Sequence, residues 1–255
     1  MRLFNLFAKS SRLGPVHSFS IYYGISDPEV KRRLAATNLT VIEPRQWQAE
    51  DIRAIREAGT DVYGYLSVME TPKWNARRWD AITEEMRLLV SGQPVYFEQW
   101  DAELMDLRSA AYRALLLAEI GELTSQVPLD GLMLDTVGDI EEYVPEALQP
   151  AMGEAYKTLL EAVTARYPGL RLLQNRGFAQ LEACAPLLSG MLWEGWNGHE
   201  ARGEWVRQRV ELLRRLRKGG LGLLASSADP SPIHGETARE HGFVHWTSAS
   251  DLYGV

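Results

Sequence analysis

Four carboxylate side chains follow short apolar runs of the kind that form buried β-strands. In chain order they are Glu43, Glu70, Asp135 and Glu194. Aromatic and amide side chains follow most of the other apolar runs. A carbohydrate cleft uses this chemistry, because aromatic faces pack on sugar C–H surfaces, amides and carboxylates bind hydroxyl groups, and two carboxylates cleave the glycosidic bond.

Asp135 and Glu194 form the pair that best fits the cleavage step. They follow the fourth and sixth of eight apolar runs, and Trp193 and Trp196 flank the glutamate. If the runs are strands of one ring, the two backbones lie roughly 10 Å apart. Their carboxyl groups then come within about 5 to 9.5 Å, a range that covers both retaining and inverting glycosidases. Taken singly, Asp135 could instead cap a helix and Glu194 could belong to a structural ion pair.

The elements that must position these residues alternate between apolar runs and amphipathic helical patterns. This alternation predicts parallel strands joined by crossover helices, and eight units in 255 residues are typical of a single α/β chain folded as a (β/α)8 TIM barrel. The eight runs cover residues 19–23, 40–42, 62–68, 131–134, 170–173, 190–193, 221–225 and 243–246.

The predicted organisation is one domain. Residues 1–16 form an N-terminal extension, and residues 17–255 form the barrel. We expect an insertion in the third βα loop over residues 70–107, with a helical pattern at 77–89 and a strand-like piece at 94–97. Trp74, Trp79 and Trp100 lie in or beside this insertion, either as its core or as a sugar-binding platform.

Composition excludes several classes of function. The net charge of −7 disfavours nucleic acid as a partner. The single cysteine, Cys184, excludes an internal disulfide and a cysteine-rich metal site. His241 and His245 fall around a strand, so we expect no metal and no organic cofactor. The sequence has neither a run of about 18 apolar residues nor a signal-peptide pattern, so we expect no membrane partner and a cytoplasmic location. Oligomeric state is left open.

Several motifs in register resemble those of glycoside hydrolase family 114, the endo-α-1,4-polygalactosaminidase-like and spherulin-4-like TIM barrels. Asp130-Gly-Leu-Met-Leu-Asp135 resembles the family's DGhhhD motif, where h is apolar. Tyr65-Leu-Ser-Val-Met-Glu70 resembles YLSxGE, and Gln174-Asn-Arg-Gly177 resembles the asparagine–glycine turn after strand five. Asp106-Leu-Arg108 resembles a DxR motif, and Trp193-Glu194 falls at the family's sixth-strand glutamate.

The resemblance implies a retaining glycosidase that cleaves an α-linked polysaccharide or oligosaccharide, galactosamine-containing polymers among them. Asp135 would be the nucleophile and Glu194 the general acid/base. The flanking tryptophans would supply the desolvation that a general acid needs. The residues expected to bind the sugar are Tyr22, Glu43, Tyr65, Glu70, Asn175, Trp196 and Trp246.

Three departures from the family pattern leave alternatives open. Met69 replaces a glycine and would crowd the site, Asp139 follows the aspartate at a longer spacing than usual, and the seventh strand ends without its acidic–aromatic pair. The first alternative is therefore a non-catalytic carbohydrate-binding barrel. A phosphosugar lyase or isomerase is disfavoured, because no lysine ends a strand and Gly219-Gly-Leu-Gly222 precedes a strand instead of opening a helix.

Overall fold

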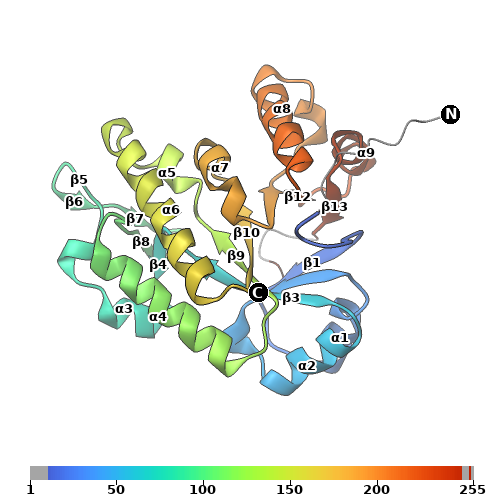
Figure 1. Cartoon of the computed structure of the whole chain (residues 1–255), viewed down its shortest axis with the longest axis horizontal. Helices are drawn as coiled ribbons and strands as arrows, with labels where there is room; N and C mark the ends of the chain where they lie inside the picture. The colour runs from blue at the N-terminus through green and yellow to red at the C-terminus, as the bar shows by residue number, and fades with distance from the viewer. Residues whose placement is uncertain (1–10, 249–252, 254–255) are drawn as a thin grey trace.

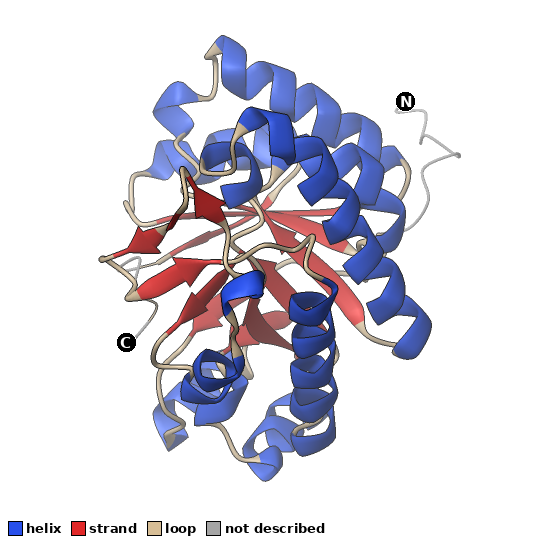
Figure 2. Ribbon diagram, turned by 90° about the vertical axis from the view of Figure 1, so that its left-hand side faces the viewer, coloured by secondary structure: helices blue, strands red, loops and turns tan. Residues whose placement is uncertain are grey.

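The computed structural model describes residues 11–248 and 253 of the chain. Eight strands, each parallel to its neighbours, form the barrel in the order β1-β2-β3-β9-β10-β11-β12-β13. Their bounds are β1 Phe19–Tyr22, β2 Leu39–Ile42, β3 Asp61–Ser67, β9 Gly131–Asp135, β10 Arg171–Asn175, β11 Gly190–Glu194, β12 Gly222–Ser227 and β13 Val244–Thr247. The predicted (β/α)8 barrel is confirmed, and Figure 2 shows the strands inside a shell of helices.

Some of the helices begin at a residue whose side chain caps them. Asp27, for example, accepts hydrogen bonds from the backbone N–H groups of Glu29 (2.8 Å) and Val30 (3.0 Å), with Pro28 in the first helical position. The outer helices are α1 Pro28–Leu34, α2 Ala49–Glu57, α4 Ala110–Gln126, α5 Asp139–Glu142, α6 Gln149–Arg166, α7 Phe178–Cys184, α8 Glu204–Lys218 and α9 Pro232–His241 (Figure 1). Helix α7 ends at Cys184, and the next residues, Ala185–Leu187 with Pro186 among them, form a 3-10 helix.

Side-chain alternation along the strands divides the barrel interior into an apolar lower part and a polar mouth. One buried apolar cluster takes alternate residues from the strands together with Leu13 and Tyr253, and its strand members are Phe19, Ile21, Leu39, Val41, Tyr63, Met133, Leu173, Leu192 and Leu224. Because strand residues two apart face the same side, the next inward position lies at or near the carboxyl end of each strand except the longer β3, where Ser67 follows Tyr65 on the same face. Those positions are Tyr23, Glu43, Tyr65, Asp135, Asn175, Glu194, Ser226 and Trp246.

The seam and the floor of the barrel are closed by large side chains. Across the seam between β1 and β13, the rings of Phe19 and Trp246 lie 5.9 Å apart. At the floor, Leu13 fills the space left by Gly190 and Gly222, where an added Cβ would collide with the leucine. Residue 13 therefore belongs to the barrel core, although the sequence places it in the extension; the boundary at residue 17 stays a prediction.

The connection between β3 and α4 differs in detail from its prediction. Helix α3 covers only Ala76–Ala81, because Ile82 is extended and the chain then passes through a 3-10 turn. The strand-like piece at 94–97 is shared between two very short strands. The strands of this connection are β4 Glu70–Pro72, β5 Leu89–Val90, β6 Gln93–Pro94, β7 Tyr96–Phe97 and β8 Ala102–Leu104. Strands β4, β8 and β7 pair antiparallel in a small sheet, and Phe97 of β7 packs on Tyr143, which follows α5, with 4.8 Å between ring centroids.

This connection shares the core that lies outside the barrel sheet. Val68, Met69, Leu104 and Met105 are buried in the same cluster as the inward faces of α4 and α6. The segment is therefore packed onto the barrel and is not a separate domain. Among the helices in the described part of the chain, none is long and apolar enough to cross a bilayer.

Candidate active site

The DGLMLD sequence places a structural aspartate and a candidate catalytic aspartate at opposite ends of one strand. At the start of β9, Asp130 accepts a hydrogen bond from the N–H of Val62 (2.9 Å) and pairs with Arg56 on α2 (2.7 Å). Gly131 leaves room for the ring of Tyr63, which an added Cβ would meet. At the other end of the strand, Asp135 reaches the mouth, where it is half-buried.

Asn175 joins the two candidate catalytic carboxylates. Its amide nitrogen Nδ2 lies 2.8 Å from Oδ1 of Asp135 and 2.5 Å from Oε2 of Glu194. The two carboxylate oxygens are therefore separated by no more than the sum of those distances, about 5.3 Å. The sequence left a range of about 5 to 9.5 Å between the two carboxyl groups, and the shared amide favours the short end of that range.

Three strands that supply these residues end in the same backbone turn. The residue after each functional side chain has a positive φ: Thr136 at 64°, Arg176 at 50° and Gly195 at 72°. This left-handed conformation is costly for a β-branched threonine. It is held in place because Oγ1 of Thr136 accepts a hydrogen bond from the N–H of Met69 (2.8 Å). Each strand therefore ends directly after its functional residue, whose side chain remains in the mouth of the barrel.

The surroundings of Glu194 favour its protonated form. Burial, and then the negative charge of Asp135, raise the pKa of Glu194. Hydrogen bonds from Tyr253 and Asn175 act in the opposite direction, because they stabilise the ionised carboxylate. A carboxyl with a raised pKa beside a second carboxylate is the arrangement that general acid catalysis requires.

A second acidic pair, Glu70 and Asp139, lies beside Asp135. The two side chains share a hydrogen bond, and both are more than nine-tenths buried. Burial raises the pKa of Glu70 to about 7, with a further contribution from the charge of Asp135. Burial and the charge of Glu70 raise the pKa of Asp139 to about 9. Near neutral pH the pair therefore holds a proton.

Tyr65 and Glu43 also occupy the predicted mouth. Tyr65 hydrogen-bonds Asp135, and burial raises the pKa of its hydroxyl well above the usual range, so the hydroxyl stays protonated. Oε1 of Glu43 accepts from the guanidinium of Arg45 at 3.0 Å, whereas Oε2 is buried without a hydrogen-bond partner. Trp246 lies at the seam, stacked on Tyr253 with 5.7 Å between ring centroids.

Two predicted sugar contacts lie elsewhere. Tyr22 faces outward: its ring packs on Trp47 and its hydroxyl donates to the carbonyl of Ile25. Because a shift of one residue reverses the face of a strand, Tyr23 occupies the inward position instead. Trp196 is only 2% exposed and its Nε1 donates to the carbonyl of His234, since the turn at Gly195 directs it into the outer core. We leave Tyr22 and Trp196 out of the proposed site.

Packing answers two questions that the sequence left open, on Met69 and on the tryptophans of the third connection. The Met69 side chain is fully buried in the outer core and does not crowd the mouth. Of the three tryptophans, Trp79 packs against that core, whereas Trp74 is 56% exposed and Trp100 is 48% exposed. Trp79 is therefore a core residue, and Trp74 and Trp100 are surface aromatics.

Sequence reasoning missed Tyr253. Its hydroxyl donates to Oε1 of Glu194, and its ring lies between Trp246 and Tyr23. It falls beyond the last predicted strand, and no local pattern marks it, so the contact over 59 residues is visible only in the fold.

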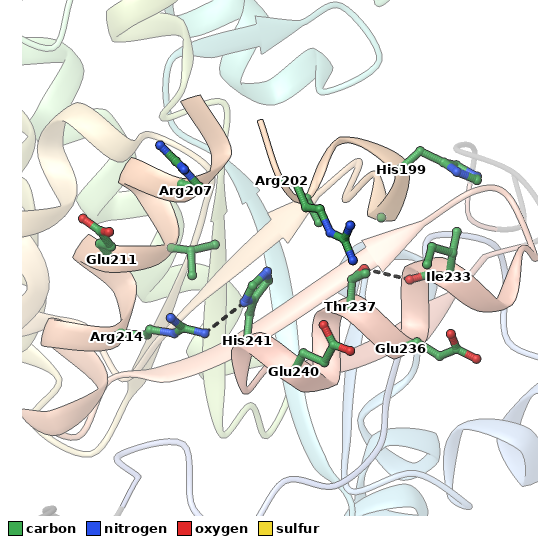
Figure 3. Close-up of a pocket in the computed structure, with 13 residues that line it drawn as sticks. His199, Arg202, Arg207, Glu211, Arg214, Ile233, Glu236, Thr237, Glu240 and His241 are labelled. Carbon is green, nitrogen blue, oxygen red and sulfur yellow. Dashed lines mark hydrogen bonds between the residues drawn. The ribbon is translucent and has the colours of Figure 1, made fainter. Parts of the chain in front are cut away.

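A separate groove of about 750 Å³ lies between α8 and α9 (Figure 3), and neither Asp135 nor Glu194 lines it. Cations and anions are mixed in its lining, and Arg214 contacts His241 at 3.1 Å. Within residues 11–248 and 253, no group of three or more His, Cys, Asp or Glu side chains could hold a metal ion.

Comparisons with solved structures show that this fold recurs in carbohydrate-active proteins. The glycoside hydrolase domain of PelA from Pseudomonas aeruginosa is 23% identical, with a TM-score of 0.78 over 94% of this chain and 97% of that chain. Ega3 of Aspergillus fumigatus, solved in complex with galactosamine, is 11% identical, with a TM-score of 0.71 over 97% of both chains. The galactosidase domain of AgaSK is more distant: it is 12% identical, with a TM-score of 0.56 over 91% of this chain and 37% of that chain.

The sequence comparisons assign the family. None of the curated proteins matches the chain. The glycoside-hydrolase family GH114 matches residues 7–205, which include both candidate catalytic carboxylates and Asn175. The chain is therefore a glycosidase that belongs to glycoside-hydrolase family GH114.

Proposed function

We propose that this glycosidase cleaves galactosamine-containing polysaccharides by a retaining mechanism, with Asp135 as the nucleophile and Glu194 as the general acid/base. The observation that carries the mechanism is the amide of Asn175, which hydrogen-bonds one oxygen of each carboxylate, so that those two oxygens lie no more than about 5.3 Å apart. Retaining enzymes place their carboxyl groups about 5 to 5.5 Å apart, whereas inverting enzymes need about 6.5 to 9.5 Å to admit a water.

The first step joins the sugar to the enzyme. Protonated Glu194 donates its proton to the glycosidic oxygen as the bond to the anomeric carbon breaks, and a carboxylate oxygen of Asp135 bonds to that carbon. The raised pKa of Glu194 keeps the proton available for this transfer. The Tyr65 hydroxyl and the Asn175 amide orient the attacking carboxylate.

The second step releases the sugar. Ionised Glu194 takes a proton from water, whose oxygen bonds to the anomeric carbon as the ester to Asp135 breaks. Glu194 ends protonated and Asp135 ends ionised, so the starting state is restored. The sugar keeps its anomeric configuration because it is inverted twice.

The acidic side chains of the mouth and the similarity to Ega3 support the substrate class. Five carboxyl groups lie at or beside the mouth: Glu43, Glu70, Asp135, Asp139 and Glu194. The Glu70–Asp139 pair and, in the first step, Glu194 hold protons, so the negative charge comes from the carboxylates that stay ionised. A galactosamine amino group is cationic, and an acidic cleft raises the local concentration of a cationic polymer. Ega3, which shares the fold, was solved in complex with galactosamine.

Hydrolysis of an α-1,4-linked galactosamine polymer, beside its fully N-acetylated form, tests the proposal. Asp135→Asn and Glu194→Gln should each lower kcat/KM by at least about a thousandfold, while the exposed Asp80→Asn stays at the wild-type rate. Faster cleavage of the N-acetylated polymer would overturn the cationic substrate. A product of inverted anomeric configuration would overturn the retaining mechanism.

The non-catalytic alternative predicts a different result. It would give sugar binding without turnover on either polymer. Asp135→Asn and Glu194→Gln would then show the same absence of turnover as the wild type. Two features argue against it. The amide of Asn175 hydrogen-bonds both Asp135 and Glu194, and Met69 is buried away from the mouth.

A further inference from the structure

Tyr253 reaches the candidate acid/base from a part of the chain that lies outside the family match, which ends at residue 205. Its hydroxyl donates to Oε1 of Glu194. On the other side, Nδ2 of Asn175 donates to Oε2 at 2.5 Å. Both oxygens of the carboxyl group are thus held, one by the strand next to it and one by a residue 59 positions further along the chain.

The position of Tyr253 is itself set by the barrel seam. Its ring stacks on Trp246 of β13, with 5.7 Å between centroids and 28° between the planes. Tyr23, which directly follows β1, packs on it edge-on at 5.4 Å and donates its backbone N–H to the Tyr253 carbonyl at 3.0 Å. Tyr253 is only 6% exposed, so its hydroxyl has a defined place in the mouth.

We propose that Tyr253 is a positioning residue for Glu194, holding the carboxyl in its catalytic orientation and stabilising its ionised form. The inference rests on the acid/base role proposed above for Glu194. A tyrosine hydroxyl suits the place because it donates to an ionised carboxylate and can accept from a protonated one. The same contact therefore serves both steps of a retaining reaction, in which Glu194 alternates between these two forms.

Other groups also act on the protonation of Glu194. From β9, the charge of Asp135 favours the protonated form, as does burial. Arg176, after β10, favours the ionised form, and the hydroxyl of Tyr23 faces the same carboxyl from the end of β1. All of these remain when Tyr253 becomes phenylalanine, which keeps the ring stack and removes one donor.

The test is the pH profile of kcat/KM for wild type and Tyr253→Phe on the galactosamine polymer. The alkaline limb reports loss of the proton from the acid in the free enzyme. Without the donor, Glu194 keeps its proton to higher pH, so the limb should move upward by roughly one to two pH units. kcat should fall by about tenfold or more, with KM little changed, because the substitution removes a hydrogen bond to Glu194.

Tyr167→Phe is the matched control. Tyr167 caps the carboxyl end of α6, at the opposite end of the barrel, and its profile should superimpose on that of wild type. Thermal unfolding of all three proteins checks that the fold is kept. A second readout is the infrared C=O band of protonated Glu194, identified by its loss in Glu194→Gln, whose titration should move with the kinetic limb.

The outcomes separate this inference from the proposed function. A Tyr253→Phe profile that superimposes on wild type, or moves to lower pH, overturns the role of Tyr253 while an inactive Glu194→Gln still upholds the acid/base. An active Glu194→Gln overturns the proposed function itself, whatever Tyr253→Phe does.

Discussion

Asn175 is the residue on which the two candidate catalytic carboxylates depend. Its two amide hydrogens are committed to Asp135 and Glu194, and its carbonyl oxygen Oδ1 is buried without a protein partner. Two like charges at this distance repel each other, and a shared donor offsets part of that repulsion. The residue therefore controls both the separation and the ionisation of the pair.

Replacing Asn175 with alanine should lower kcat/KM by roughly 10- to 100-fold, because one hydrogen bond to a charged group contributes about 1.5 to 3 kcal/mol. Glu194 also loses a donor, so the alkaline limb of the pH profile should move upward. Steady-state kinetics across pH measure both effects. Gln126→Ala, which truncates an exposed amide on α4, should change neither; equal kinetics for the two variants would contradict the bridging role.

At the scale of elements, the third connection is anchored to the barrel by one buried guanidinium. Nη1 of Arg78 donates to the carbonyls of Ser67 (2.8 Å) and Glu70 (3.1 Å), and Nε pairs with Glu119 of α4 at 2.6 Å. Glu119 also accepts from Asn75 at 2.9 Å. The turn that carries Glu70 to the mouth is thus tied to a long helix.

Arg78→Met should destabilise the protein by about 3 to 5 kcal/mol, because it leaves Glu119 buried with its main charge partner removed. Arg78→Met combined with Glu119→Leu should cost less than Arg78→Met alone, since no uncompensated charge remains. Denaturant unfolding gives these values, and KM should rise in both variants as the Glu70 turn loosens. Arg77→Met, at the exposed neighbour, should change stability by less than about 0.5 kcal/mol. A loss as large as that of Arg78→Met would contradict the anchor.

Over the whole molecule, the apolar core and the candidate active site lie at opposite ends of the barrel. Leu13, seated against Gly190 and Gly222, closes an apolar floor, whereas the mouth gathers carboxylates with too few cations to neutralise them. The buried acidic pair of Glu70 and Asp139 is the clearest case, because folding raises both pKa values. The folded state therefore binds protons that the unfolded chain releases.

This linkage predicts how stability depends on pH. The carboxyl of Asp139 has a pKa of about 9 when folded and about 3.9 when unfolded, so the free energy of unfolding should fall as pH rises between those values. Asp139→Asn removes the titrating group and should flatten this decline. Thermal unfolding at pH 5, 7 and 9 measures it, with the exposed Asp80→Asn as control. Parallel declines in wild type and Asp139→Asn would contradict the prediction.

The sequence by itself determined the eight strands, their parallel order and the carboxylates at their ends, because buried parallel strands are continuous apolar runs and barrel sites form where such runs stop. It could not determine which side chains meet. Tyr22 and Tyr23 are neighbours on one strand and point to opposite faces of the sheet. Which of them faces the barrel interior depends on the register of β1 against the neighbouring strands. The Asn175 bridge and the Tyr253 contact join residues 19 to 59 positions apart, and only the closed barrel brings them together. Local patterns describe elements, whereas a catalytic geometry is a set of long-range distances.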